Sequence, residues 1–225
     1  PVHDRPGLII DIHGGPTAYA KRGLRGTTQF FAKSGFSFAS VDYRGSVGYG
    51  ATYRRSLNGH YGEYDVDDIR AVAHSLLERG EIDPTRVFVR GGSSGGMTAL
   101  LAAEDEIFAG AIAHYPVTDT HRLNAATHEV EGCYLEELIG PLPESIDKFN
   151  SISPQFRDRF PKKVLLTHGV EDGVIPVQLA RDYVAKLQEA GVTVTYLEFP
   201  GEGHGYHAID VQAQVLDAEQ TFLRN

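Results

Sequence analysis

The chain of 225 residues is long enough for one domain with a sizeable core, and its 41% hydrophobic and 23% charged residues are ordinary for a globular protein. Its 30 acidic residues outnumber its 21 basic ones, and the formal charge of −9 disfavours a nucleic-acid-binding surface, which needs a basic face. The sequence has no run of 18 apolar residues that would predict a membrane span. Cys133 is the single cysteine, so an intrachain disulfide is excluded. We expect one domain over residues 1–225 with no nucleic-acid or membrane partner. Because the segment PVHDRPG does not resemble a signal peptide, we expect the protein to lie in the cytoplasm.

Short apolar runs and longer amphipathic segments alternate along the chain. The runs predict strands at 7–13, 36–41, 86–90, 108–115, 163–168 and 192–199. The longer segments predict helices at 24–34, 65–79, 97–105, 176–190 and 207–223. Strands that alternate with helices form a parallel sheet with right-handed crossovers, so the predicted fold class is α/β with helices on both faces of the sheet.

The segment 117–161 interrupts this alternation because it is polar, contains four prolines and has only short helical pieces such as 134–139. Two interpretations stay open: a cap over the active-site end of the sheet, or a surface excursion. His128 and Glu129 begin a zinc-binding H-E-x-x-H pattern, but position 132 is glycine. We therefore expect no metal site and no cofactor.

The stretch VFVRGGSSGGMT, residues 87–98, predicts a strand, a sharp turn and a helix with a hydroxyl group at the turn. It contains the pattern G-x-S-x-G of a nucleophile elbow in two registers, one with Ser93 at the turn and one with Ser94. We favour Ser93, which leaves Ser94 to supply a backbone N–H at the helix start. A plain structural turn is the alternative, whereas the phosphate-binding glycine patterns have no register here.

A serine nucleophile needs a base, and the base needs an orienting acid. In α/β hydrolases these residues follow the serine in the order acid, then histidine, in loops after later strands. Asp172 follows the fifth predicted strand and His204 follows the sixth. Both therefore lie at the carboxyl ends of the strands, where ligands bind in this class of fold. Glu171 is the competing acid and His207 the alternative base; an ordinary turn aspartate and a solvated histidine are the structural interpretations.

The developing oxyanion needs two N–H donors. The backbone N–H of Ser94 supplies one, and the loop HGGP after the first strand supplies the other. Gly15 is the expected donor in that loop, since Pro16 has no N–H.

Several motifs together resemble the prolyl oligopeptidase family of serine peptidases, in particular its acylaminoacyl-peptidase and dipeptidyl-aminopeptidase branch. The resemblance covers nearly the whole chain and rests on HGGP (13–16), YRGSVGYG (43–50), GEYDVDD (62–68), GGSSGG (91–96), HGVEDGVIP (168–176) and GEGHGY (201–206). It implies an α/β-hydrolase fold, supports the register with Ser93 as nucleophile, and assigns Asp172 and His204 as acid and base.

The same resemblance implies Gly15 and Ser94 as oxyanion donors, and a mainly structural role for Tyr43 and Arg44. The family usually carries a β-propeller and an eight-stranded sheet, but few residues precede the HGGP strand here. We therefore expect no propeller, and a sheet of six strands in the order 2-1-3-4-5-6 that lacks the first two strands of the family's sheet. Strand 36–41 would then be an exposed edge, which fits either a fragment of a longer peptidase or a short form that forms homo-oligomers through this edge.

The resemblance favours cleavage of a peptide or amide bond through an acyl-enzyme, as in an aminopeptidase, dipeptidyl-peptidase or acylaminoacyl-peptidase. The expected substrates are small peptides, aminoacyl amides or esters. The alternative is a carboxylesterase that acts on small esters, since a chain without a propeller is open to them. A non-catalytic protein that uses the hydrolase scaffold for binding is a third interpretation.

Overall fold

A computed structural model describes residues 4–126 and 129–224. Its centre is one six-stranded sheet with the order β2-β1-β3-β4-β5-β6, in which all neighbouring strands are parallel. The strands are β1 Gly7–Ile12, β2 Phe36–Val41, β3 Val87–Gly92, β4 Gly110–His114, β5 Lys163–Gly169 and β6 Thr193–Phe199. The six predicted strands and their order are confirmed.

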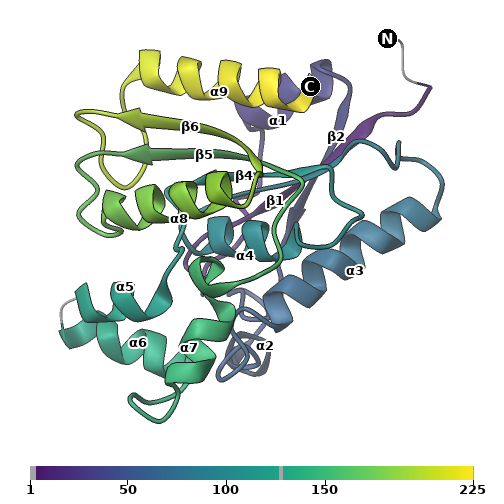
Figure 1. Ribbon diagram of the computed structural model, residues 1–225. Helices are drawn as coiled ribbons and strands as arrows, with labels where there is room; N and C mark the ends of the chain where they lie inside the picture. The colour runs from purple at the N-terminus through teal and green to yellow at the C-terminus, as the bar shows by residue number, and fades with distance from the viewer. Residues whose placement is uncertain (1–3, 127–128, 225) are drawn as a thin grey trace.

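Helices cover both faces of the sheet (Figure 1). They are α1 Gly26–Lys33, α2 Ala51–Arg55, α3 Tyr64–Glu78, α4 Ser94–Ala102, α5 Thr120–Ala126, α6 Glu129–Ile139, α7 Ile146–Ile152, α8 Val177–Glu189, α9 Ile209–Arg224 and the short 3-10 helix Pro154–Phe156. Helices α1 and α9 lie on one face, and α3, α4 and α8 lie on the other.

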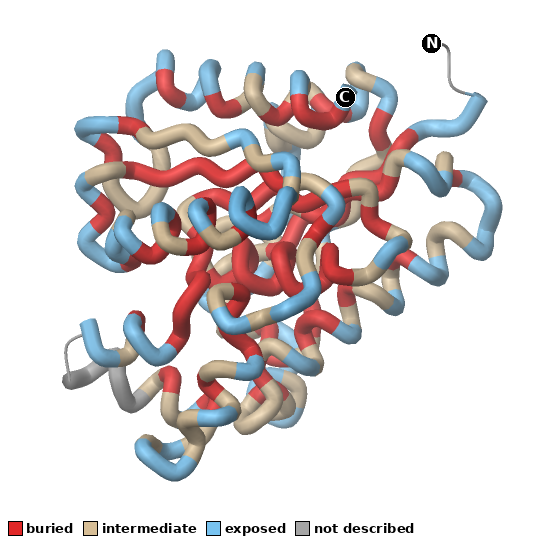
Figure 2. Tube along the Cα trace, viewed as in Figure 1, coloured by how far each residue is buried: buried red, intermediate tan, exposed pale blue. Residues whose placement is uncertain are grey.

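The two faces of the sheet carry separate cores because side chains alternate along each strand. In β1, Ile9 packs with Phe31 of α1 and Phe222 of α9, whereas Ile10 belongs to the cluster of α3, α4 and α8. All six residues of β1 are buried. Figure 2 shows the same pattern, with buried backbone through the central strands and exposed residues on the outer sides of the helices.

The segment 117–161 is more helical than the sequence indicates. It forms α5, α6, α7 and the 3-10 helix, and α6 begins at Glu129 rather than near position 134. Helix α2 was not predicted either, because five residues are too few to show a helical period. Tyr134 of α6 contacts the loop after β1, where its hydroxyl group accepts a hydrogen bond from the backbone N–H of Thr17 at 3.1 Å.

Candidate active site

The turn between β3 and α4 holds Ser93 in a strained conformation. Its φ of 59° and ψ of −127° lie outside the usual regions for a residue with a side chain. Glycines two residues before and after Ser93 permit the tight turn: a Cβ on Gly91 would lie 2.3 Å from the carbonyl oxygen of Gly95, and a Cβ on Gly95 would lie 2.3 Å from that of Ile12. Ser93 therefore occupies the position of the nucleophile in an elbow.

Ser94 is the first residue of α4, and its side chain is turned away from this position. It is buried, and its Oγ accepts a hydrogen bond of 2.8 Å from the hydroxyl group of Tyr61. Only its backbone N–H remains for a role at the turn, as the favoured register requires.

Asp172 and His204 lie in contact, although they follow different strands. Nδ1 of His204 is 2.8 Å from Oδ2 of Asp172. Because an ionised carboxylate only accepts hydrogen bonds, Nδ1 carries the proton, and Nε2 of His204 is left as a base. The alternative pair is not formed: Glu171 and His207 are both exposed, and the backbone N–H groups of both point to Glu202.

Four groups surround the carboxylate of Asp172. Its Oδ1 accepts 2.8 Å hydrogen bonds from the backbone N–H groups of Val174 and Ile175. Its Oδ2 meets His204 and lies 3.5 Å from Nε2 of the buried His168. Burial alone would raise the pKa of Asp172, but hydrogen bonds from His168, His204 and the two backbone N–H groups hold that pKa well below its ordinary value. Asp172 is therefore a stable anion beside His204.

Glu202, which the sequence analysis quoted only as part of a motif, fixes the loop of His204. Its carboxylate accepts 2.8 Å hydrogen bonds from the backbone N–H groups of His207 and Ala208, and its carbonyl oxygen accepts one of 2.9 Å from Glu171. The loops that carry Asp172 and His204 are thus joined through Glu202. An acidic residue two positions before the histidine, close to a helix start, is the signal that indicates this role.

The HGGP loop lies against the elbow. A Cβ on Gly14 would lie 3.3 Å from that of Ser93, and Gly15 has a φ of +123°, which favours glycine. The hydroxyl group of Tyr43 anchors the loop, since it lies 3.1 Å from the carbonyl oxygens of both His13 and Pro16. This contact agrees with the structural role expected for Tyr43.

Ser93, His204 and Gly15 line one pocket of about 620 Å³. Tyr115 also lines it, and its ring lies 4.7 Å from that of His204. The contacts among the described residues include no hydrogen bond between Ser93 and His204. The described residues of segment 117–161 do not line this pocket.

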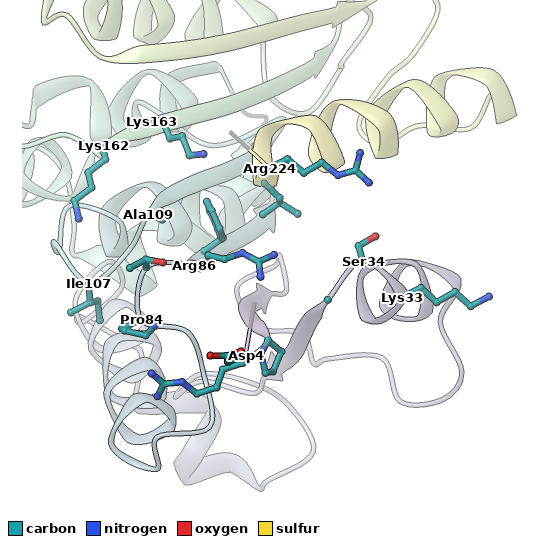
Figure 3. A pocket seen from close by; sticks show the side chains of 16 residues that line it. Asp4, Lys33, Ser34, Pro84, Arg86, Ile107, Ala109, Lys162, Lys163 and Arg224 are labelled. Atoms are coloured by element: carbon teal, nitrogen blue, oxygen red, sulfur yellow. The ribbon is translucent and has the colours of Figure 1, made fainter. Parts of the chain in front are cut away.

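A larger hollow of about 1210 Å³ opens at the amino ends of the strands (Figure 3). Lys162 and Lys163 reach it from the start of β5, Arg86 from the residue before β3, and Arg224 from the end of α9. None of the five predicted site residues lines it. Its size therefore does not make it the candidate active site.

No group of three or more His, Cys, Asp or Glu side chains in the described part of the chain is placed to hold a metal ion. His128 lies outside the described residues, as do the side chains of Glu129 and Cys133. Within residues 4–126 and 129–224, every helix is too short or too polar to cross a membrane.

A parallel sheet that brings a serine at an elbow, an acid and a histidine to the carboxyl ends of its strands, here β3, β5 and β6, is typical of the α/β-hydrolase class. Within this class, the model of the prolyl oligopeptidase family matches residues 23–225. The chain belongs to this family of serine peptidases.

Among its relatives, the acylamino-acid-releasing enzyme of Arabidopsis thaliana is 31% identical over 207 residues, which are 88% of this chain and 27% of that enzyme. The dipeptidyl aminopeptidase BIII of Pseudoxanthomonas mexicana is 28% identical, over 88% of this chain and 30% of its own length. The chain therefore spans less than a third of these two curated relatives.

Solved structures are similar over almost the whole chain. A puromycin-hydrolysing peptidase of Mycobacterium tuberculosis has a TM-score of 0.95 and 35% identity, over 99% of this chain and 34% of that one. A mutant puromycin hydrolase in complex with PGG has a TM-score of 0.94 and 35% identity, over the same shares of the two chains.

Proposed function

We propose that the chain is the catalytic part of a serine peptidase that cleaves peptide or amide bonds through an acyl-enzyme. One observation carries the proposal: a buried, ionised Asp172 binds His204 on the wall of the pocket where the strained Ser93 lies. The peptidase names of the relatives support an amide rather than an ester as the bond cleaved.

In this mechanism, Nε2 of His204 takes the proton of Ser93 as Oγ forms a bond to the substrate carbonyl carbon. Asp172 stabilises the imidazolium that results. The backbone N–H groups of Gly15 and Ser94 bind the oxyanion. The C–N bond then breaks, His204 protonates the departing amine, and a water molecule activated in the same way releases the acyl group.

The proposed ligands are small peptides and aminoacyl amides, and the proposed location is the cytoplasm. The names of the relatives support a substrate of this kind. The cysteine usage supports the location, because a lone cysteine gives no sign of an oxidising compartment.

Kinetics with an aminoacyl anilide and a short-chain aryl ester test this proposal. Ser93→Ala should lower kcat/KM by at least about 10⁴-fold on the anilide, since it removes the nucleophile. Ser94→Ala is the matched control, because it keeps the backbone N–H and should retain most of the activity. Turnover of the ester alone would contradict the peptidase assignment, and an unchanged rate in Ser93→Ala would contradict the nucleophile.

A further inference from the structure

The pocket that contains Ser93 and His204 has a charged wall, which the mechanism does not use. Asp11, Lys21, Arg25 and Arg90 all line it. Asp11 is the penultimate residue of β1 and Arg90 lies beside it in β3, in register. Arg25 immediately precedes α1, and Lys21 lies in the loop before it.

The buried charges of this wall are matched by one another. Nε and Nη2 of Arg90 donate 3.0 Å hydrogen bonds to the two oxygens of Glu219 from α9, and Nη1 donates one of 2.8 Å to Asp11. Burial would raise the pKa of Glu219, but Arg90 and His114 hold it at about 2. Glu219 therefore keeps its charge, and Arg90 is committed to the interior of the protein.

Arg25 differs from Arg90 because most of its donors are free. Nη1 of Arg25 donates to Asp11 at 2.9 Å, and this is the only side-chain hydrogen bond of Arg25 among the described residues. Its side chain is 32% exposed, against 16% for Arg90. An arginine fork that is half-buried at a pocket wall and has unused N–H groups fits the geometry of a carboxylate.

Lys21 adds a positive charge that no carboxylate of the described residues balances within 4 Å. Asp11 and Glu219 together carry two negative charges, and Arg25 and Arg90 carry two positive ones. Among the described side chains that line the pocket of the nucleophile, Lys21, Arg25 and Arg90 are cationic, and Asp11 is the only carboxylate. An arginine whose only role was to anchor its loop to Asp11 would not need a second cation, Lys21, beside it.

We propose that Arg25 and Lys21 form a carboxylate-binding subsite in the pocket of Ser93. The inference rests on the proposed function, because the ligand is then a peptide substrate that carries a carboxylate within reach of the scissile bond. Two sources share this chemistry: the C-terminal carboxylate of a short peptide and an acidic side chain.

Calorimetric titration of the full chain carrying Ser93→Ala separates binding from turnover. The ligands are Ala-Ala-Ala and its C-terminal amide, together with the amidated pair Ala-Glu-Ala and Ala-Gln-Ala. We expect about tenfold tighter binding of the carboxylate member of one pair, which identifies the source of the carboxylate. Lys21→Gln should reduce this preference, and Arg25→Gln with Lys21→Gln should abolish it.

Arg22→Gln is the control, since Arg22 lies in the same loop, does not line the pocket and bonds only to the hydroxyl group of Tyr49 at 3.3 Å among the described contacts. It should leave the preference unchanged. Equal affinities within both pairs would overturn the subsite, as would a preference that survives the double substitution. Labelling of Ser93 by a fluorophosphonate in the unmodified chain tests separately whether Ser93 is an activated nucleophile. A labelled Ser93 with equal affinities in the titrations would overturn the subsite alone, whereas an unlabelled Ser93 would contradict the proposed function.

Discussion

At the scale of single residues, the contacts of Asp172 explain how a buried carboxylate stays ionised. Two backbone N–H groups and two histidines surround it, and their hydrogen bonds outweigh the cost of burial. The anion fixes the proton of His204 on Nδ1, so Nε2 can act as a base. A neutral side chain of the same shape would not give this preference.

We predict that Asp172→Asn lowers kcat by about 10⁴-fold, because an amide group facing Nδ1 favours the wrong histidine tautomer. Glu171→Gln is the matched control, since the neighbouring carboxylate is exposed and should leave kcat nearly unchanged. Steady-state kinetics with an aminoacyl anilide compares the two variants. A larger loss of kcat in Glu171→Gln than in Asp172→Asn would show that Asp172 is not the acid of the triad.

The residues of the candidate site were predictable because each lies in a short motif directly after a predicted strand. Their supporting residues were not. Asp11 lies within an apolar run, and Glu219 lies on an amphipathic helix where a carboxylate is normally solvated. Arg90 joins the two although Glu219 is 129 positions away in the sequence, and no local pattern shows such a contact.

At the scale of elements, Asp65 joins the start of α3 to α4. Its Oδ1 accepts a 2.7 Å hydrogen bond from the backbone N–H of Gly62, and its Oδ2 accepts one of 2.6 Å from Thr98. The side chain is fully buried and no cation pairs with it among the described residues. Burial raises the pKa of Asp65 to about 6, in spite of these hydrogen bonds.

The raised pKa of Asp65 predicts a pH dependence of stability. Between pH 4 and 6 the folded chain binds this proton and the unfolded chain releases it, so the contribution of Asp65 to the free energy of unfolding falls as pH rises, by roughly 2 kcal/mol. Urea unfolding at pH 4 and pH 6 should show that Asp65→Asn removes this contribution. Asp67→Asn, in the same turn but exposed, should keep it. Identical pH profiles for the two variants would show that Asp65 titrates normally.

The strands were predictable as elements because each is a short apolar run bounded by turn residues, and the alternation with helices then fixed a parallel sheet. The short helices α2, α5 and α7 were not, because five to seven residues span at most two turns. Tertiary contacts stabilise such helices. One example is Thr120, whose side chain donates a 3.0 Å hydrogen bond from α5 to the carbonyl oxygen of Phe149 in α7.

At the scale of the whole molecule, strands β2 and β6 form the two edges of the sheet. Strand β2 forms one edge next to the fully buried β1, and only Phe36 of its six residues is buried. An edge of this kind presents unpaired backbone groups to another strand.

We predict that residues 1–225, produced alone, self-associate through β2. Sedimentation velocity should show a sedimentation coefficient that rises with protein concentration. Ser40→Lys, at an exposed position of β2, should suppress this rise, because charges block edge pairing. Thr195→Lys, on the opposite edge strand β6, should not. A stable monomer at all concentrations would contradict the prediction.

The central claim is that Ser93, His204 and Asp172 form one working catalytic unit. Labelling with a fluorophosphonate, followed by peptide mass mapping, tests it most directly, because the reagent modifies a serine only where a base and an oxyanion site already act on it. We predict a single adduct on Ser93, which Asp172→Asn slows strongly. A folded chain that gives no adduct, or an adduct on Ser94 instead, would contradict the account.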